Sequence, residues 1–217
     1  MRLVLLRHGR TEWNAQRRFQ GQSDPPLDEV GRAQAYEVAG LVAALRPDRL
    51  VSSDSARAMQ TAAIVAAAIG MEVISDARLR ERSLGHWEGL TRDEVAERFP
   101  EEFAEWVAGR DVLTRGGETR DAVAARSLEA FNDQPKLELI IFVTHSATAM
   151  ALSNALLGIG QKQHPLGPLA NCHWSELSEE GGVWRLRAHN LGVPGTVVPL
   201  PVRLEDAALE DSPDADA

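Results

Sequence analysis

Two apolar runs of strand length constrain the fold of this chain more than any other feature of its sequence. They are Leu3–Leu6 and Leu139–Thr144. Continuous runs of this kind are typical of strands covered on both faces, because a half-exposed strand alternates apolar and polar residues. Strand-like and helix-like stretches alternate between and around them. The sequence therefore predicts an α/β fold with helices on both faces of a sheet, as one domain over residues 1–202.

Apolar spacing and capping residues predict the helices. Asp28 is expected to cap a helix with the stripe Val38, Leu41, Val42 and Leu45, and a helix from about Ala56 to Gly70 is expected to bury Met59, Ala62, Ala63, Ala66 and Ile69. Further helices are expected over Thr91–Phe99 and Glu102–Val107, after Thr119, and from about Ala147 to Leu157. A short strand is expected at Leu50-Val51, and a late hairpin around Gly181-Gly182.

Composition and charge exclude several classes of protein. With 44% apolar residues the chain can fill a core, and its single cysteine, Cys172, excludes an internal disulfide. Twenty-three basic against 32 acidic residues give a net charge of -9, which argues against binding to nucleic acid or an anionic membrane. No apolar run approaches ~20 residues and no signal peptide is evident, so a cytoplasmic protein is expected. Residues 203–217 hold six acidic residues and one arginine, and we expect a disordered tail there.

Polar side chains follow three of the predicted strands. Arg7 and His8 come after the first strand, Arg57 lies in the turn and helix after the second, and His145 follows the late strand. Ligands of open α/β sheets bind at the carboxyl ends of strands, so these four side chains should meet in one crevice. An arginine in the first turn of a helix is unfavourable unless an anion binds there. The alternative is a surface Arg57 paired with Asp54.

Two imidazoles and two guanidiniums are suited to phosphoryl transfer without a metal. A histidine can attack phosphorus, and arginines can stabilise the charge on the phosphoryl oxygens. Glu81 is the candidate for the acid that such a site needs, although the sequence around it also fits a surface glutamate between two salt-bridging arginines. A zinc site is the alternative use of the six histidines, but no helical pair of histidines supports one. We therefore predict no metal and no cofactor, and read His86, His164, His173 and His189 as structural or surface residues.

An ordered series of motifs resembles the histidine phosphatase superfamily, which includes the cofactor-dependent phosphoglycerate mutases. The series spans most of residues 2–190. Its segments are Leu5–Asn14 with Arg7-His8-Gly9, Gln20-Gly21, Asp24–Leu27, Gly31–Ala35, Ser52–Asp54 with Arg57-Ala58, Gln60–Ala62, Leu79–Glu81, Gly85–Gly89, Gly116–Thr119 and Thr144-His145.

The resemblance implies a fold and a set of roles. The fold is a three-layer sandwich with a mostly parallel, mixed sheet. His8 would be the phosphorylated nucleophile and Glu81 the proton donor. The phosphate would be bound by Arg7, Arg57 and His145, with Asn14, Gln20, Gly21 and Ser146 beside it.

Two positions depart from the family's pattern. Arg10 stands where an acidic or amide residue is usual, and it would place an extra cation near the mouth of the site, suited to a second anionic group on the substrate. Ser146-Ala147 follows the second histidine, where a glycine is common, and Ser146 is expected to be the N-cap of the next helix.

The resemblance also bears on the reaction and on the partners. The mutases carry a longer insertion where this chain has only the segment Gly89–Arg115, so we expect a phosphatase that acts on a small phosphorylated metabolite. The alternatives are a mutase and a non-catalytic module that binds phosphorylated ligands. Gly116–Ser127, Asn171–Trp174 and Val183–Leu186 are similar to glucosyl-3-phosphoglycerate phosphatases. A homodimer is expected from the family and from Trp174 and Trp184, which would give the hairpin an apolar edge.

Overall fold

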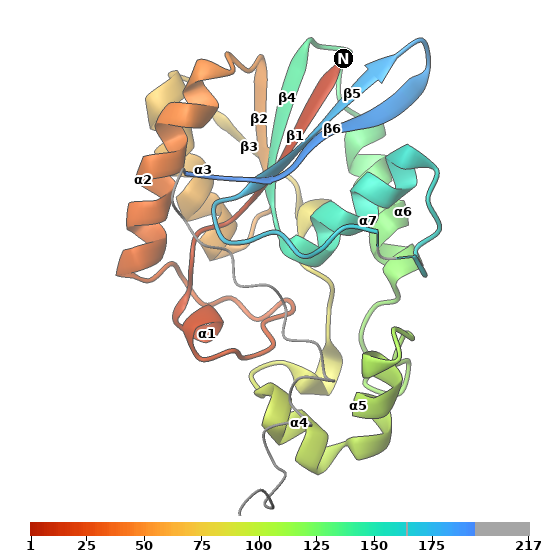
Figure 1. The fold of residues 1–217 in the computed structure, drawn as a ribbon. Helices are drawn as coiled ribbons and strands as arrows, with labels where there is room; N and C mark the ends of the chain where they lie inside the picture. The colour runs from red at the N-terminus through yellow and green to blue at the C-terminus, as the bar shows by residue number, and fades with distance from the viewer. Residues whose placement is uncertain (164, 194–217) are drawn as a thin grey trace, which may run out of the picture.

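A six-stranded sheet forms the centre of the protein (Figure 1). The computed structural model describes residues 1–163 and 165–193. The strands are β1 (Arg2–Arg7), β2 (Arg49–Ser52), β3 (Val73–Ser75), β4 (Leu139–Thr144), β5 (Trp174–Glu180) and β6 (Val183–Leu191), in the order β3-β2-β4-β1-β5-β6. Strands β3, β2, β4 and β1 run parallel to one another. Strand β5 is antiparallel to β1, and β6 is antiparallel to β5. The predicted α/β fold with a mostly parallel, mixed sheet is confirmed. The predicted domain end at residue 202 and the tail at 203–217 lie outside the described residues.

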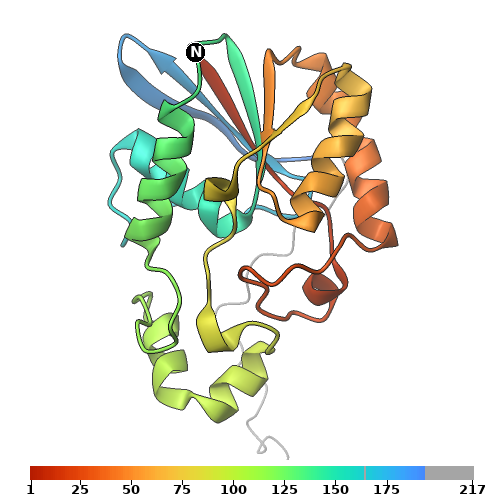
Figure 2. The same ribbon diagram turned by 180° about the vertical axis from the view of Figure 1, so that it is seen from behind.

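Two helices cover each face of the sheet. Helices α2 (Glu29–Ala44) and α3 (Ala56–Ile69) lie on one face, and α6 (Arg120–Asn132) and α7 (Ser146–Leu157) lie on the other (Figures 1 and 2). Strand β1 serves both layers: Val4 and Leu6 pack with α2 and α3, whereas Leu3 and Leu5 pack with α6 and α7. This double burial explains why the run has no polar residue.

A smaller layer lies beyond the carboxyl ends of β1, β2 and β4 (Figure 2). It contains α4 (Arg92–Arg98) and α5 (Pro100–Val107), with the short helices α1 (Glu12–Ala15) and η2 (Gly85–Trp87) nearby, whereas η1 (Ala77–Leu79) packs against α6 and β4. Trp87 is fully buried here against Phe19 and Trp106. Both predicted helices around Pro100 are found, but the second begins at Pro100 itself, because proline is tolerated in the first turn. This layer supplies the outer wall of the site.

Two predicted helix faces are rotated from their expected positions. In α2 the buried residues are Gly31, Ala35, Val38, Ala39 and Val42, while Leu41 stays 38% exposed. Small residues at 35 and 39 allow close packing, and a pattern based on large apolar residues misses them. In α3, Arg57 and Thr61 are buried with Ala58, Ala62 and Val65, whereas Met59 is half-buried and Ala63 is exposed. The inward direction of Arg57 sets the orientation of that helix.

The predicted late hairpin is present, but its tryptophans do not form an apolar edge. Gly181 and Gly182 both have positive φ, as a two-residue hairpin turn requires. Trp174 is 7% exposed within the core, and Trp184 packs its ring 5.4 Å from that of Phe131. Trp174 is therefore part of the core, whereas Trp184 is half-buried beside Phe131. No helix among the described residues is long and apolar enough to cross a membrane.

Candidate active site

The predicted convergence of the strand ends is found at the centre of the sheet. Strands β1 and β4 are direct neighbours with Arg7 opposite Thr144, and the His8 amide donates to the Thr144 carbonyl at 3.0 Å. The rings of His8 and His145 therefore lie 5.0 Å apart, nearly edge to face. Because β2 pairs with β4 on the other side, α3 brings Arg57 to the same place.

His8 is held in the form that can act as a nucleophile. It is 3% exposed, and its Nδ1 lies 2.7 Å from the carbonyl of Gly9. A carbonyl can only accept, so Nδ1 carries the proton and the neutral ring keeps its lone pair on Nε2. Burial, Arg57 and Arg7 together lower the pKa of His8 well below its ordinary value. The ring is therefore neutral at pH 7, with Nε2 available for attack.

Arg7 and Arg57 place two cations beside this imidazole. Arg57 is 1% exposed, and it donates from Nη1 to the Ser23 carbonyl at 2.7 Å and from Nη2 to the Gly21 carbonyl at 2.8 Å. Arg7 donates to the Leu169 carbonyl, and burial lowers its pKa to about 10, so it remains charged at neutral pH. The alternative of a surface Arg57 paired with Asp54 is wrong, since Asp54 pairs with Arg80. One buried and one half-buried guanidinium suit a doubly charged phosphoryl group.

His145 lies behind His8 and does not line the cleft. Its Nε2 is 3.0 Å from Ser53 Oγ and 3.2 Å from Ser55 Oγ, and it is fully buried. Burial, followed by the charge of Arg57, lowers its pKa well below the ordinary value. A neutral His145 packs against the edge of the His8 ring without adding a further charge.

Glu81 faces the cleft with His8. Its carboxylate accepts hydrogen bonds from the amides of Arg82 at 2.8 Å and of Ala147 and Thr148 at 3.2 Å each. The last two amides belong to the first turn of α7, so the N-terminal end of that helix fixes the carboxylate. Both flanking arginines pair elsewhere, Arg80 with Asp54 and Arg82 with Asp111. Glu81 is therefore directed into the cleft and is not the surface glutamate of the alternative reading.

The remaining predicted residues divide into two groups. Asn14, Gln20 and Gly21 line the cleft. Ser146 does not: its Oγ accepts from the Leu169 amide at 3.1 Å, and the N-cap of α7 is His145 rather than Ser146. Arg10 is also turned away, because it pairs with Asp28 at 2.8 Å and stays outside the cleft lining. The extra cation expected at the mouth is therefore used to tie Arg10 to the cap of α2.

The histidines expected to be structural have local partners. His86 pairs with Glu102, His173 is buried with Nδ1 3.0 Å from the Asn171 carbonyl, and His189 lies 2.8 Å from Ser175 Oγ. His164 lies outside the described residues. Among the residues that the structure describes, no group of three or more His, Cys, Asp or Glu side chains could hold a metal ion.

The cleft in front of His8 has a volume of about 710 Å³, far more than a phosphate needs. Its wall includes side chains that the sequence did not single out, above all Phe19, Leu84, Trp106, Met150 and four arginines: Arg18, Arg82, Arg92 and Arg120. With Arg7 and Arg57 this makes six arginines against one acidic residue, Glu81. The lining of the cleft is therefore basic although the chain has a net charge of -9, and Arg18, Arg82 and Arg120 are paired with Glu94 and Asp111 outside the lining.

A family model described as the histidine phosphatase superfamily, branch 1, matches residues 3–192. The chain belongs to this superfamily. Several relatives of this histidine phosphatase are also named phosphatases. The glucosyl-3-phosphoglycerate phosphatase of Mycolicibacterium vanbaalenii is 38% identical over 192 residues, which cover 82% of this chain and 84% of the relative. A probable phosphoglycerate mutase of Escherichia coli is 34% identical over 188 residues, covering 85% and 87% of the two chains.

Solved structures agree with the sequence relatives. A mycobacterial glucosyl-3-phosphoglycerate phosphatase, solved as a complex with VO3, superposes with a TM-score of 0.79 at 37% identity, over 87% of this chain and 98% of that one. YhfR of Bacillus stearothermophilus gives the same TM-score at 30% identity, over 87% of this chain and 96% of that one. The prediction of a phosphatase rather than a mutase is thus supported by the higher identity of the phosphatases.

Proposed function

We propose that this histidine phosphatase hydrolyses a phosphomonoester in two steps, through a phosphohistidine at His8. In the first step His8 Nε2 bonds to phosphorus, the bond from phosphorus to the ester oxygen breaks, and Glu81 gives its proton to the leaving alkoxide. In the second step Glu81 takes a proton from water, the water oxygen bonds to phosphorus, and the phosphorus–nitrogen bond breaks to free His8. Arg7 and Arg57 stabilise the charge on the phosphoryl oxygens in both steps.

One observation carries this proposal: the hydrogen bond of 2.7 Å between His8 Nδ1 and the Gly9 carbonyl. It leaves Nε2 as the free nucleophilic atom of a neutral ring. Arg7 and Arg57 beside it provide the charge that a phosphoryl group needs. Asn14 and the backbone at Gly21 complete the lining on the α1 side of the cleft.

Trapping of the intermediate tests the proposal. Mixing the protein with a labelled aryl phosphate and quenching in alkali should leave label on the wild type, because phosphohistidine survives alkali. The His8→Ala protein should retain no label and lose turnover. Label on His8→Ala, or full turnover by it, would refute the role of His8. Excess chelator should leave the rate unchanged, since every group in the two steps is an amino-acid side chain.

We propose glucosyl-3-phosphoglycerate, or a close analogue, as the natural substrate. The relatives named for this substrate support it, and the volume of the cleft accommodates a sugar beyond the phosphate. A panel of phosphorylated metabolites tests this choice, and a preferred substrate without a glycerate group would overturn it.

The alternatives to a phosphatase are separated by two measurements. A mutase would interconvert phosphoglycerate isomers, primed by 2,3-bisphosphoglycerate, faster than it releases phosphate; we expect release to dominate. A binding module would bind phosphate without ever becoming labelled. The homodimer stays a prediction without an assigned surface, and light scattering at micromolar concentration tests it.

A further inference from the structure

One peptide unit connects the nucleophile to helix α2. The carbonyl of Gly9 lies 2.7 Å from His8 Nδ1, and the amide of Arg10, which belongs to the same peptide unit, donates to Gln34 Oε1 at 2.9 Å. The C=O and N–H of a trans peptide point in opposite directions. The Gly9 carbonyl therefore faces His8 only while the Arg10 amide faces the side on which Gln34 lies.

The neighbouring peptide units are held by other groups. The Gly9 amide donates to Thr61 Oγ1 at 3.0 Å, and the Arg10 carbonyl accepts from the Asp28 amide at 3.1 Å. Neither bond acts on the unit that carries the Gly9 carbonyl. Gln34 is bonded directly to that unit, so its side chain is placed to fix the rotation of the unit.

Helix α2 brings Gln34 to this place through the close approach of two glycines. A side chain at Gly9 would collide with the Gly31 carbonyl, and one at Gly31 would collide with the Arg10 carbonyl. Gln34 follows Gly31 by three residues and therefore lies on the same face of α2. Helical side chains point back toward the N-terminal end, so the half-buried Gln34 reaches over Gly31 to the Arg10 amide.

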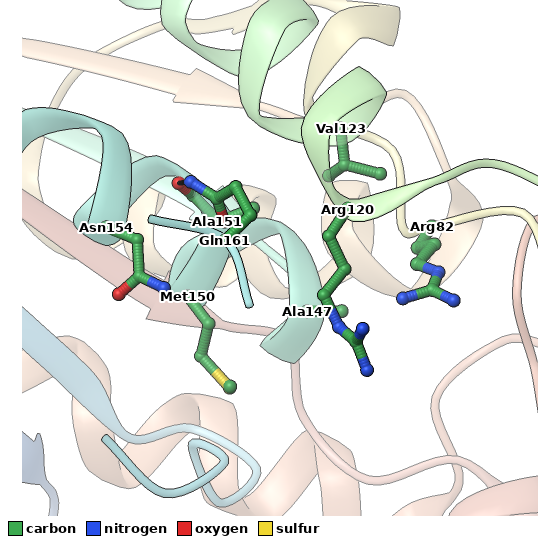
Figure 3. Close-up of a pocket in the computed structure, with 8 residues that line it drawn as sticks. All are labelled: Arg82, Arg120, Val123, Ala147, Met150, Ala151, Asn154 and Gln161. Carbon is green, nitrogen blue, oxygen red and sulfur yellow. Dashed lines mark hydrogen bonds between the residues drawn. The ribbon is translucent and has the colours of Figure 1, made fainter. Parts of the chain in front are cut away.

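Gln34 acts from outside the cleft. Arg120 of α6 and Met150 of α7 line the cleft from one face of the sheet, whereas α2 covers the other face and Gln34 lies outside the lining (Figures 1 and 3). Any effect of Gln34 on the reaction must therefore pass through the Gly9–Arg10 peptide.

That peptide serves His8 twice during the proposed reaction. In the free enzyme its carbonyl keeps the proton on Nδ1, which leaves the lone pair on Nε2. When Nε2 bonds to phosphorus the ring becomes cationic, so the hydrogen bond from Nδ1 to the carbonyl becomes charge-assisted and stronger. Hydrogen bonds in a chain polarise one another, so an acceptor on the Arg10 amide makes the Gly9 carbonyl a better acceptor.

We propose that Gln34 is a positioning residue, which sets the tautomer of His8 and stabilises its cationic form through the Gly9–Arg10 peptide. This role rests on the proposed function, because it affects the reaction only if His8 Nε2 attacks phosphorus. The competing interpretation is a glutamine that merely ties the loop to α2. In that case the loss of Gln34 lowers the stability of the protein and leaves the imidazole as it was.

Variants with and without an acceptor at position 34 test the proposal. Gln34→Met has a similar length and favours a helix as well, but it offers the Arg10 amide no oxygen, whereas Gln34→Glu does. Nitrogen-15 NMR of the histidine rings shows which nitrogen carries the proton, and His8→Ala identifies the signals of His8 among those of the six histidines. In Gln34→Met we expect the ratio of the Nδ1–H form to the Nε2–H form to fall about 3- to 10-fold, the effect of losing one neutral hydrogen bond. Gln34→Glu should match the wild type.

The rate of phosphoenzyme formation gives the second readout. At saturating aryl phosphate, label should appear on Gln34→Met about 3- to 10-fold more slowly than on the wild type. The inhibition constant of inorganic phosphate should not rise, because Arg7 and Arg57 stay in place. Gln134→Met is the matched control: this half-buried glutamine donates to the Ala130 carbonyl at 2.8 Å, beyond the end of α6, and its loss should change neither readout.

Several results would overturn this role. They are an unchanged tautomer ratio or an unchanged labelling rate in Gln34→Met, equal losses in Gln34→Glu and Gln34→Met, and a phosphate inhibition constant that rises in step with the loss of rate. Gln34→Ala, which also lacks an acceptor, repeats the test if Gln34→Met does not fold. The NMR readout needs no turnover, so the two proposals can fail separately. A changed tautomer in a protein whose wild type never becomes labelled refutes only the proposed function, whereas a labelled wild type with no effect of Gln34→Met refutes only the role of Gln34.

Discussion

Glu88 should act as a positioning residue for the phosphoryl site, although it does not line the cleft. Its carboxylate accepts from the amides of Gln22 at 3.1 Å, Ser23 at 2.9 Å and Leu84 at 2.9 Å, and from Ser23 Oγ at 3.0 Å. The loop that it holds supplies the carbonyls of Gly21 and Ser23, which direct the two ends of the Arg57 guanidinium. A side chain at Gly21 would collide with Glu88, and φ there is positive, so glycine is required. Glu88→Ala should therefore release the loop and misdirect Arg57.

The size of this effect follows from these hydrogen bonds, to which Ser83 Oγ adds a fifth at 3.4 Å. A hydrogen bond to a charged group contributes about 1.5–3 kcal/mol. Glu88 is half-buried, so water can replace some of them, and the net loss of two bonds at the lower limit gives about 3 kcal/mol. At roughly 2–4 °C per kcal/mol for a chain of this size, Tm should fall by about 6–12 °C. The misplaced guanidinium should lower kcat/KM for an aryl phosphate by about 10–100-fold.

Scanning calorimetry measures the change in Tm, and steady-state kinetics well below Tm measures the change in kcat/KM. Inhibition by inorganic phosphate is the readout specific to positioning. The inhibition constant should rise with the loss of kcat/KM, which a merely destabilised but correctly folded enzyme would not show. Glu97→Gln, on the exposed side of α4, is the control and should change neither quantity. An unchanged phosphate inhibition constant in Glu88→Ala would refute the reasoning.

Three further predictions concern proton transfer and pH. Glu81→Gln should slow the hydrolysis of alkyl phosphates by about 10²–10⁴-fold, but it should slow that of a nitrophenyl phosphate much less, because that leaving group barely needs a proton. Equal losses in kcat/KM on both substrates would exclude Glu81 as the acid. The pKa of His8 is lowered, so the acidic limb of the pH profile of kcat/KM should have its midpoint below pH 6.5, once the profile is corrected for the fraction of dianionic substrate. A midpoint at pH 7 or above would contradict the neutral nucleophile. The pKa values of both His8 and His145 are lowered in the folded state, so the unfolded state binds more protons below about pH 6.5. The free energy of unfolding should therefore fall as pH drops through that value. The fall is at most about 2.7 kcal/mol per pH unit for two histidines. Denaturant titrations from pH 7.5 to 5 measure this pH dependence of the free energy of unfolding, and His145→Phe should reduce the slope.

Periodicity and capping predicted the fold well, because those signals are local. The run Leu139–Thr144 became β4 with the predicted bounds, and Asp28 and Thr119 cap the helices they were expected to cap. Strand β3 was missed, since only three residues form it and Ile74 remains 38% exposed. The rotation of α3 was missed for another reason: it depends on where Arg57 must point, which no pattern of apolar residues encodes.

The candidate site was predictable to the extent that its residues follow strands. Arg7 ends β1, and His8 and His145 come directly after β1 and β4, so the topology alone brings them together. Ser146 was placed wrongly because a hydroxyl at a helix start suggests a cap, yet the turn after β4 directs it to the Leu169 amide. The positioning role of Glu88 could not be identified, since Gln22 and Ser23, its partners in the loop that directs Arg57, lie about 65 residues away and meet it only in the folded chain.

The charge of the whole chain gave no indication of the charge in its cleft, and distance explains why. At physiological ionic strength, charges are screened beyond about 8 Å, so exposed acidic residues have little effect on a ligand bound next to His8. Arg57 is buried and Arg7 is half-buried, so both act at contact distance in a medium less polar than water, where each interaction is stronger. A phosphate dianion should therefore bind to a protein of net charge -9 with only a modest dependence on salt. The same cations that bind it also keep His8 neutral, so one pair of side chains both attracts the substrate and prepares the nucleophile.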